Sequence, residues 1–167
     1  MSRKGFTLIE LMVTVVIVGI LAGIAVPKLF GHTAKAKAAE ITPAAFTYIK
    51  LQQAFFHEPK GVGSWNKIGY APPGGGKTKN FRYTRGDITS SVRPSYVGAS
   101  FGGQGLVGWQ AESLVGLNQC LLGNKWVVRL ILSGSGMEYK TQLLSSESAP
   151  SCLIMTGPDW AIYSVSD

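Results

Sequence analysis

The sequence predicts an α+β fold in which one long N-terminal helix packs, through its C-terminal half, on an antiparallel β-sheet. An apolar run opens the chain, a stretch with helical periodicity follows it, and the remainder holds short strand-like segments separated by turns rich in glycine and serine. The chain has 167 residues, which is enough for one globular head after the apolar segment is set aside.

The apolar segment runs from Phe6 to Val26, and its 21 residues would form a helix about 30 Å long, the thickness of a hydrocarbon core. Arg3 and Lys4 precede it, so the positive-inside tendency places the N-terminus in the cytoplasm and the head outside it. Its polar side chains are Thr7, Thr14 and Glu10.

Glu10 is the unusual residue of this segment, because charged side chains cost about 2.5–3.5 kcal/mol at the centre of an inserted helix. A shallow, hydrated position near the helix start is one explanation. Cleavage after Gly5 is another: it would give Phe6 a positively charged amine four residues from Glu10. That amine would be within reach in one helix or between staggered parallel helices. The pair would then set the register of an assembly, since removing one partner of a buried ion pair costs about 3–5 kcal/mol.

Two plainer interpretations compete with an assembly segment. A secretory signal peptide would have an uninterrupted apolar centre and a small-x-small cleavage site, but the nearest such site, Ala34-Lys35-Ala36, comes late. A simple membrane anchor leaves the carboxylate unexplained.

The stretch Gly5-Phe6-Thr7-Leu8-Ile9-Glu10, followed by about twenty apolar residues and Pro27, resembles the N-terminus of type IV prepilins and of their relatives in type II secretion. The resemblance implies that a membrane aspartyl prepilin peptidase cuts after Gly5 and N-methylates Phe6. It also implies that Glu10 aligns neighbouring N-termini in a helical filament.

By the same resemblance, the helix loosens between Gly19 and Pro27 during assembly. Glycine and proline both weaken a helix, which agrees with this expectation. Cytoplasmic ATPases and an assembly platform in the inner membrane would drive extraction of the subunit.

An amphipathic pattern follows Pro27. Apolar or weakly polar residues recur at helical spacing at Ala38, Ile41, Ala45, Tyr48, Gln52 and Phe55. Pro43 should bend this helix, and Pro59 with Gly61 should end it. We therefore expect a leader over 1–5, a membrane and filament-core helix over 6–27, an amphipathic half over 28–58 and a head over 59–167.

Strand-like runs in the head predict the sheet. They are Phe81–Thr84, Lys125–Leu132, Glu138–Leu144, Cys152–Met155 and Ala161–Val165. Ser133 to Gly136 predicts a hairpin turn, and the region Gly98 to Gln119 receives no assignment.

Cys120 and Cys152 are the two cysteines of the chain. In an oxidising compartment they would form one disulfide, and two buried free thiols are the alternative. A closed loop of 33 residues contributes about 3.5–4 kcal/mol in the chain-entropy model. The pilin resemblance implies a similar C-terminal region bounded by a disulfide.

No residue pattern supports catalysis, a metal or a cofactor. His32 and His57 lie 25 residues apart without accompanying cysteines. The segment Ala71–Thr78 fits a relaxed phosphate-loop pattern, but two prolines lie within it and a strand follows instead of a helix. We expect a solvated turn there.

A basic cluster lies in the head, interleaved with Phe81, Tyr83 and Tyr96; it consists of Lys77, Lys79, Arg82, Arg85 and Arg93. It could hold DNA, and exposed tryptophans (Trp65, Trp109, Trp126, Trp160) could stack on polysaccharide. The plainer alternative is a solvated strand face whose aromatic residues alternate into the core.

The sequence therefore predicts a type IV pilin-like subunit: an inner-membrane precursor, processed after Gly5 and polymerised into an extracellular filament that supports adhesion, motility or DNA uptake. A pseudopilin of a type II secretion system is the first alternative. A secreted DNA- or polysaccharide-binding protein that never polymerises is the second.

Overall fold

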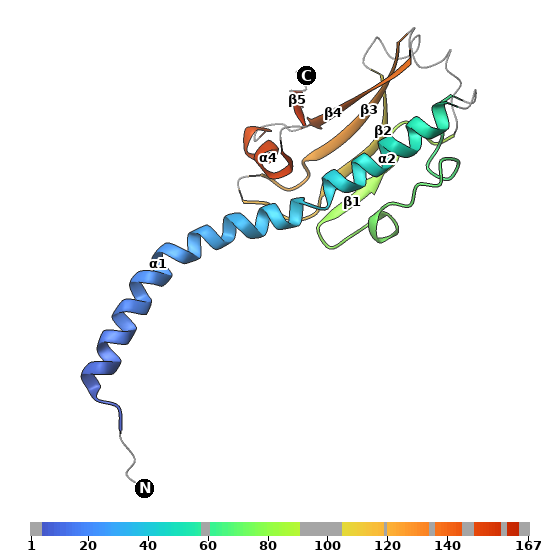
Figure 1. Ribbon diagram of the computed structural model, residues 1–167. Coiled ribbons are helices and arrows are strands. Elements are labelled where there is room, and N and C mark those ends of the chain that lie inside the picture. Colours follow the sequence, from blue (N-terminus) through green and yellow to red (C-terminus); the bar gives the residue numbers. More distant parts are fainter. Residues whose placement is uncertain are drawn as a thin grey trace.

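The computed structural model describes residues 5–57, 61–90, 105–118, 120–133, 136–144, 149–157 and 160–163. Figure 1 shows a long, curved N-terminal helix whose first half projects from the head, while its continuation lies along one face of a β-sheet. The predicted α+β architecture is confirmed.

Two helices in tandem form the N-terminal rod: α1 (Leu8–Ala38) and α2 (Ile41–Phe56). The short turn between them, at Ala39 and Glu40, keeps right-handed helical dihedrals, so the axis is interrupted only briefly. The predicted bend at Pro43 was therefore wrong in position. A proline ring clashes with the carbonyl four residues before it, here that of Ala39, while its missing N–H does no harm in the first turn of α2.

The sheet contains five strands in the order β1-β2-β3-β4-β5. Their bounds are β1 Phe81–Thr84, β2 Leu106–Ser113, β3 Lys125–Ser133, β4 Gly136–Leu144 and β5 Ala161–Tyr163. The first four pair antiparallel, and the predicted β3–β4 hairpin pairs as far as Ser133 with Gly136. Strand β5 departs from the predicted pattern because it pairs parallel to β4.

The parallel pairing of β5 follows from helix α4 (Ala149–Thr156), which occupies the crossover between β4 and β5. The prediction of a strand at Cys152–Met155 was wrong, because this run lies inside α4. A short apolar run does not distinguish a strand from a buried helix, whereas Pro150 suits the first turn of a helix. Parallel strands need such a crossover.

Strand β2 is the element that the sequence prediction missed, within the unassigned region Gly98–Gln119. A bulge between Val107 and Trp109 interrupts the pairing of β2 with β3 and breaks the alternation of buried and exposed residues. Gly108 occupies the bulge, where the hydroxyl of Tyr48 lies 2.0 Å from the position a Cβ atom would take. Only glycine lets helix α2 approach the sheet this closely.

The core lies between α2 and the sheet. The predicted helix face is confirmed, because Ala38, Ile41, Ala45, Tyr48 and Gln52 are all buried. Gln52 donates a hydrogen bond to the hydroxyl of Tyr48 (2.9 Å) and accepts one from the N–H of Gly63 (3.1 Å). The buried amide thus ties the loop after α2 to the helix without leaving unpaired polar atoms of its own.

A disulfide joins Cys120 to Cys152, with their Cα atoms 4.9 Å apart. It connects the β2–β3 loop to α4, and both cysteines are fully buried. The side-chain N–H₂ of Asn124 donates to both sulfur atoms, at 3.4 and 3.2 Å. The bond therefore closes the C-terminal part of the head over the sheet.

We expect the double substitution Cys120→Ser/Cys152→Ser to lower the free energy of unfolding by about 2–4 kcal/mol, because the unfolded chain gains the entropy of an open loop. Denaturant unfolding of the full chain in detergent measures this loss. The variant should also become insensitive to thiol reductants. An unchanged unfolding midpoint would contradict the stabilising role.

Gly108→Ala should destabilise the head by about 1–3 kcal/mol, because the added methyl group overlaps the buried Tyr48 hydroxyl and overpacks the contact between helix and sheet. Gly116→Ala is the matched control, since no heavy atom lies within 4 Å of its Cβ position; it should change stability by less than about 0.5 kcal/mol. Equal unfolding midpoints for the two variants would show that the packing at Gly108 has been misjudged.

Candidate processing and assembly segment

The bond after Gly5 lies in an accessible segment. Gly5 and Phe6 precede the first turn of α1 and have no regular secondary structure. The side chain of Phe6 is 85% exposed. A peptidase that needs an extended substrate can therefore reach this bond without unwinding the helix.

Thr7 and Glu10 form a capping box at the start of α1. The Thr7 hydroxyl accepts a hydrogen bond from the backbone N–H of Glu10 (3.3 Å). In return, the Glu10 carboxylate accepts one from the backbone N–H of Thr7 (2.9 Å) and one from its hydroxyl (2.7 Å). Sequence reasoning missed this partner, although Thr-x-x-Glu before an apolar run is a recognised capping signal.

The threonine hydroxyls within the helix are satisfied by its own backbone. Thr14 donates to the carbonyl of Leu11 (2.8 Å), and Thr33 donates to that of Phe30 (2.8 Å). Such bonds let a hydroxyl enter an apolar environment at low cost. Glu10 differs, because Thr7 donates both of its hydrogen bonds to Oε2, and these bonds leave the negative charge uncompensated.

The first part of α1 exposes an unbroken apolar surface. Its large side chains, from Leu8 (77%) to Phe30 (64%), stand free of the head. The helical rod is long and apolar enough to cross a membrane, by length and composition. An isolated surface of this size is unstable in water, so lipid or further copies of the helix must cover it.

Gly19 and Gly23 lie on this exposed part of α1, with no atom near their Cβ positions. Pro27 lies inside the helix, which nevertheless runs unbroken through it. The loosening between Gly19 and Pro27 that the resemblance implies therefore stays a prediction about the assembled state.

Known proteins share the N-terminal sequence of this segment. A family profile described as the prokaryotic N-terminal methylation motif matches residues 1–26. The type IV narrow pilus major component PilA5 of Thermus thermophilus is 35% identical over 92 residues, which cover 55% of this chain and 78% of that protein. The chain belongs to the type IV pilin family.

Two further relatives of this pilin match a smaller share of their own length. The type IV major pilin protein PilA of Myxococcus xanthus is 40% identical over 76 residues, covering 45% of this chain and 34% of that protein. The type IV major pilin protein PilE1 of Neisseria gonorrhoeae is 32% identical over 112 residues, covering 64% of this chain and 62% of that protein. The similarity therefore reaches beyond the N-terminal motif into the head.

The basic cluster of this pilin occupies the β1 edge of the head. Lys77, Lys79, Arg82 and Arg85 are exposed, while Arg93 lies outside the described residues. Phe81 and Tyr83 are buried, so the strand alternates cations outward and rings inward. Arg82 reaches Glu112 at 3.9 Å, a surface pair of little energetic weight. The described part of the cluster thus offers charge without exposed aromatic rings.

The four tryptophans are buried, which contradicts the alternative that they are exposed for stacking on polysaccharide. Their exposed fractions are 7% for Trp65, 0% for Trp109, 0% for Trp126 and 2% for Trp160. Each of their indole N–H groups also donates a hydrogen bond inside the head; the acceptors are Gly108, Tyr70, Thr156 and Thr42. The rings are structural, and stacking on polysaccharide through them is excluded.

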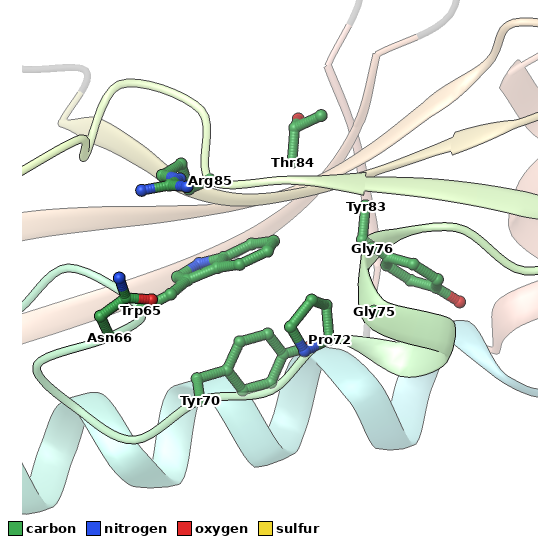
Figure 2. Close-up of a pocket in the computed structure, with 9 residues that line it drawn as sticks. All are labelled: Trp65, Asn66, Tyr70, Pro72, Gly75, Gly76, Tyr83, Thr84 and Arg85. Atoms are coloured by element: carbon green, nitrogen blue, oxygen red, sulfur yellow. The ribbon is translucent and has the colours of Figure 1, made fainter.

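A cavity of about 410 Å³ lies beside the basic cluster. Figure 2 shows Trp65, Tyr70 and Pro72 gathered around it, with Arg85 and Asn66 at its side. Burial raises the pKa of Tyr70 to about 12, so its hydroxyl stays neutral, donates to Ala44 (3.2 Å) and accepts from the Trp109 indole (2.8 Å).

The phosphate-loop-like segment forms part of the wall of this cavity through Pro72, Gly75 and Gly76. It contains a short 3₁₀ turn, Pro73–Gly76, and strand β1 follows. The helix N-terminus that a phosphate loop needs is not present at this point of the described chain.

Candidate metal ligands do not gather in the described part of this pilin. No three His, Cys, Asp or Glu side chains come together among these residues. His32 and His57 are exposed on the rod, one on α1 and one at the end of α2.

Proposed function

We propose that this pilin is the structural subunit of a type IV pilus, processed after Gly5 and polymerised through α1. The observation that carries the proposal is the carboxylate of Glu10. Thr7 donates two hydrogen bonds to its Oε2, but its charge lies within the segment 6–26, whose other side chains are uncharged and mostly apolar. A cation created by processing at Phe6 would neutralise it.

The geometry of the capping box favours this use of Glu10. The carboxylate already accepts a hydrogen bond from the backbone N–H of Thr7 at 2.9 Å, one residue from the backbone nitrogen of Phe6. Cleavage would turn that nitrogen into an ammonium group close to the carboxylate. In a filament the ammonium group of one copy can replace Thr7 as the partner of a neighbour's Glu10. The exchange replaces a bond with one charged partner by an ion pair with two, and it would fix the stagger between helices.

The route to the filament follows from the exposed helix. The precursor would reside in the inner membrane with its head outside the cytoplasm. A prepilin peptidase would remove the leader and methylate Phe6. An assembly platform would then move α1 from lipid into a bundle of identical helices, which replaces one apolar environment with another. The relatives from Thermus thermophilus, Myxococcus xanthus and Neisseria gonorrhoeae are major components or major pilins of type IV pili, which supports a filament over a secretion pseudopilus.

If the finished filament contacts DNA, we expect the exposed basic side chains at the β1 edge to make that contact. These are Lys77, Lys79, Arg82 and Arg85. Since Phe81 and Tyr83 are buried, such binding would be electrostatic, without base stacking. It would weaken steeply with added salt. Adhesion and motility would depend on the filament as a whole.

Electron microscopy of surface filaments after gene deletion, beside an assay of secreted enzymes, separates a pilus from a secretion pseudopilus. Loss of filaments with normal secretion is expected. The reverse result would assign the chain to type II secretion.

The mature protein should lack Met1 to Gly5 and carry one added methyl group on Phe6. Intact mass of protein purified from the envelope, with N-terminal sequencing, measures both changes. Gly5→Val should stay at precursor mass, because the branched side chain obstructs the cleavage site. A mature chain that starts near Lys37 would instead show a signal peptide cut after Ala36.

Glu10→Val should leave processing intact but lower incorporation into filaments by at least about tenfold in a strain that also makes unaltered subunit. A loss of 1.4 kcal/mol already gives that factor, and an unpaired buried ammonium costs more. Met12→Val, an apolar exchange on the same helix, is the control and should incorporate normally. Quantitative mass spectrometry of sheared filaments gives the ratio. Equal incorporation of both variants would remove the role of Glu10.

A further inference from the structure

The turn between β2 and β3 carries two exposed leucines. Leu121 is 54% exposed and Leu122 is 66% exposed. Among the described residues of the head, the other large apolar side chain that is exposed is Phe46, at 37%. An adjacent pair of leucines in water needs an explanation, because single exposed apolar residues are common and clusters are not.

This turn, residues 120–124, is held rigidly. The backbone N–H of Gly123 donates to the carbonyl of Ser113 (3.0 Å), and the N–H of Ser113 donates to the carbonyl of Asn124 (3.0 Å). The Asn124 side chain also donates to the carbonyl of Leu121 (2.8 Å). With Cys120 fixed by the disulfide, the fold presents the two leucines on a fixed support.

The turn lies at the end of the head that faces the projecting part of α1 (Figure 1). The side-chain nitrogen of Asn118, in the same loop, lies 3.9 Å from the Cβ position of Gly31 on α1. Gly31 comes five residues after Val26, the end of the apolar segment, which is about 7.5 Å further along the helix axis. The headgroup region on each side of a bilayer is about 5–8 Å thick. The loop therefore lies at headgroup level when α1 spans the membrane.

The charges at this level have the sign that suits anionic lipid. Lys28 is exposed at this level, about 3 Å beyond Val26, and Lys35 and Lys37 are exposed further along α1, about 14 and 17 Å beyond Val26. Glu40, the acidic residue nearest to them on the rod, accepts a hydrogen bond from the Thr78 hydroxyl at 2.7 Å. Basic side chains next to a membrane helix are attracted by anionic headgroups.

We propose that the turn 120–124 docks the head on the outer leaflet of the membrane in which α1 is inserted, with Leu121 and Leu122 entering the headgroup boundary. The proposal rests on the membrane stage of the proposed function. The loop that carries the apolar pair lies against α1 at Gly31, just beyond the apolar segment, and the exposed Lys28 on this part of α1 favours anionic lipid. Docking would fix the orientation of the head before the subunit is extracted.

The test places a tryptophan on the turn. Full-length Leu122→Trp is reconstituted in vesicles of phosphatidylethanolamine and phosphatidylglycerol that contain lipids brominated near the headgroup. Because the four native tryptophans are buried, the difference from unaltered protein reports the added indole. We expect the bromines to quench most of that added emission, and neutral phosphatidylcholine vesicles to reduce the quenching.

Gln53→Trp is the matched control. Gln53 is exposed on α2, about 33 Å along the helix axis from Gly31, so its indole should not be quenched. Equal quenching of the two variants, or none in either, would overturn docking. A blue shift of the Leu122→Trp emission that grows with the protein-to-lipid ratio, without quenching, would assign the leucines to a second copy and also overturn it. Flotation of the same vesicles tests insertion separately, since a chain that does not float would refute the membrane stage itself.

Discussion

One uncompensated charge, on the carboxylate of Glu10, constrains the whole molecule. Thr7 donates two hydrogen bonds to its Oε2, and its place in the first turn of α1 favours a negative charge through the helix dipole. Neither effect removes the cost of moving the charge into lipid or a dry helix bundle. The capping box makes this cost tolerable at the membrane surface, and a processed amine would remove it inside a filament. In the proposed filament, the residue that weakens the membrane helix would therefore set the register between copies.

The head has to be rigid for this register to reach the outside of a filament. Tyr48, Gln52 and Gly108 bring α2 into close contact with the sheet, and the disulfide closes the C-terminal part of the head. At the junction of α1 and α2, Thr42 donates to the carbonyl of Thr156 at 3.2 Å. Because these contacts hold the second half of the rod, a stagger set by the first half fixes the position of every head.

The sequence predicts the rod better than the sheet. The apolar segment and the buried face of α2 depend on local periodicity, so they were found. Strand β2 was not, because the bulge at Gly108 breaks the alternation that marks a strand. Part of helix α4 was predicted as a strand, because the four apolar residues Cys152–Met155 are compatible with either a strand or a buried helix. The alternative of exposed tryptophans could not be settled from the sequence, because a distant partner, such as the Gly108 carbonyl that accepts from Trp65, decides whether the ring is buried. The same limit applies to Leu121 and Leu122, whose exposure depends on tertiary contacts.

Helix α1 stays unbroken through Gly19, Gly23 and Pro27, although glycine and proline weaken a helix. The surrounding lipid explains this better than the residues themselves do. In lipid, any backbone group released from the helix would lack a hydrogen-bond partner, so the helical state is favoured despite the weak residues. In a packed filament, side chains or water between neighbouring helices can satisfy the groups that Pro27 leaves free. The cost of loosening therefore falls when the segment leaves the membrane. If the segment between Gly19 and Pro27 loosens as predicted, this argument makes the loosening a consequence of polymerisation and not a precondition for it.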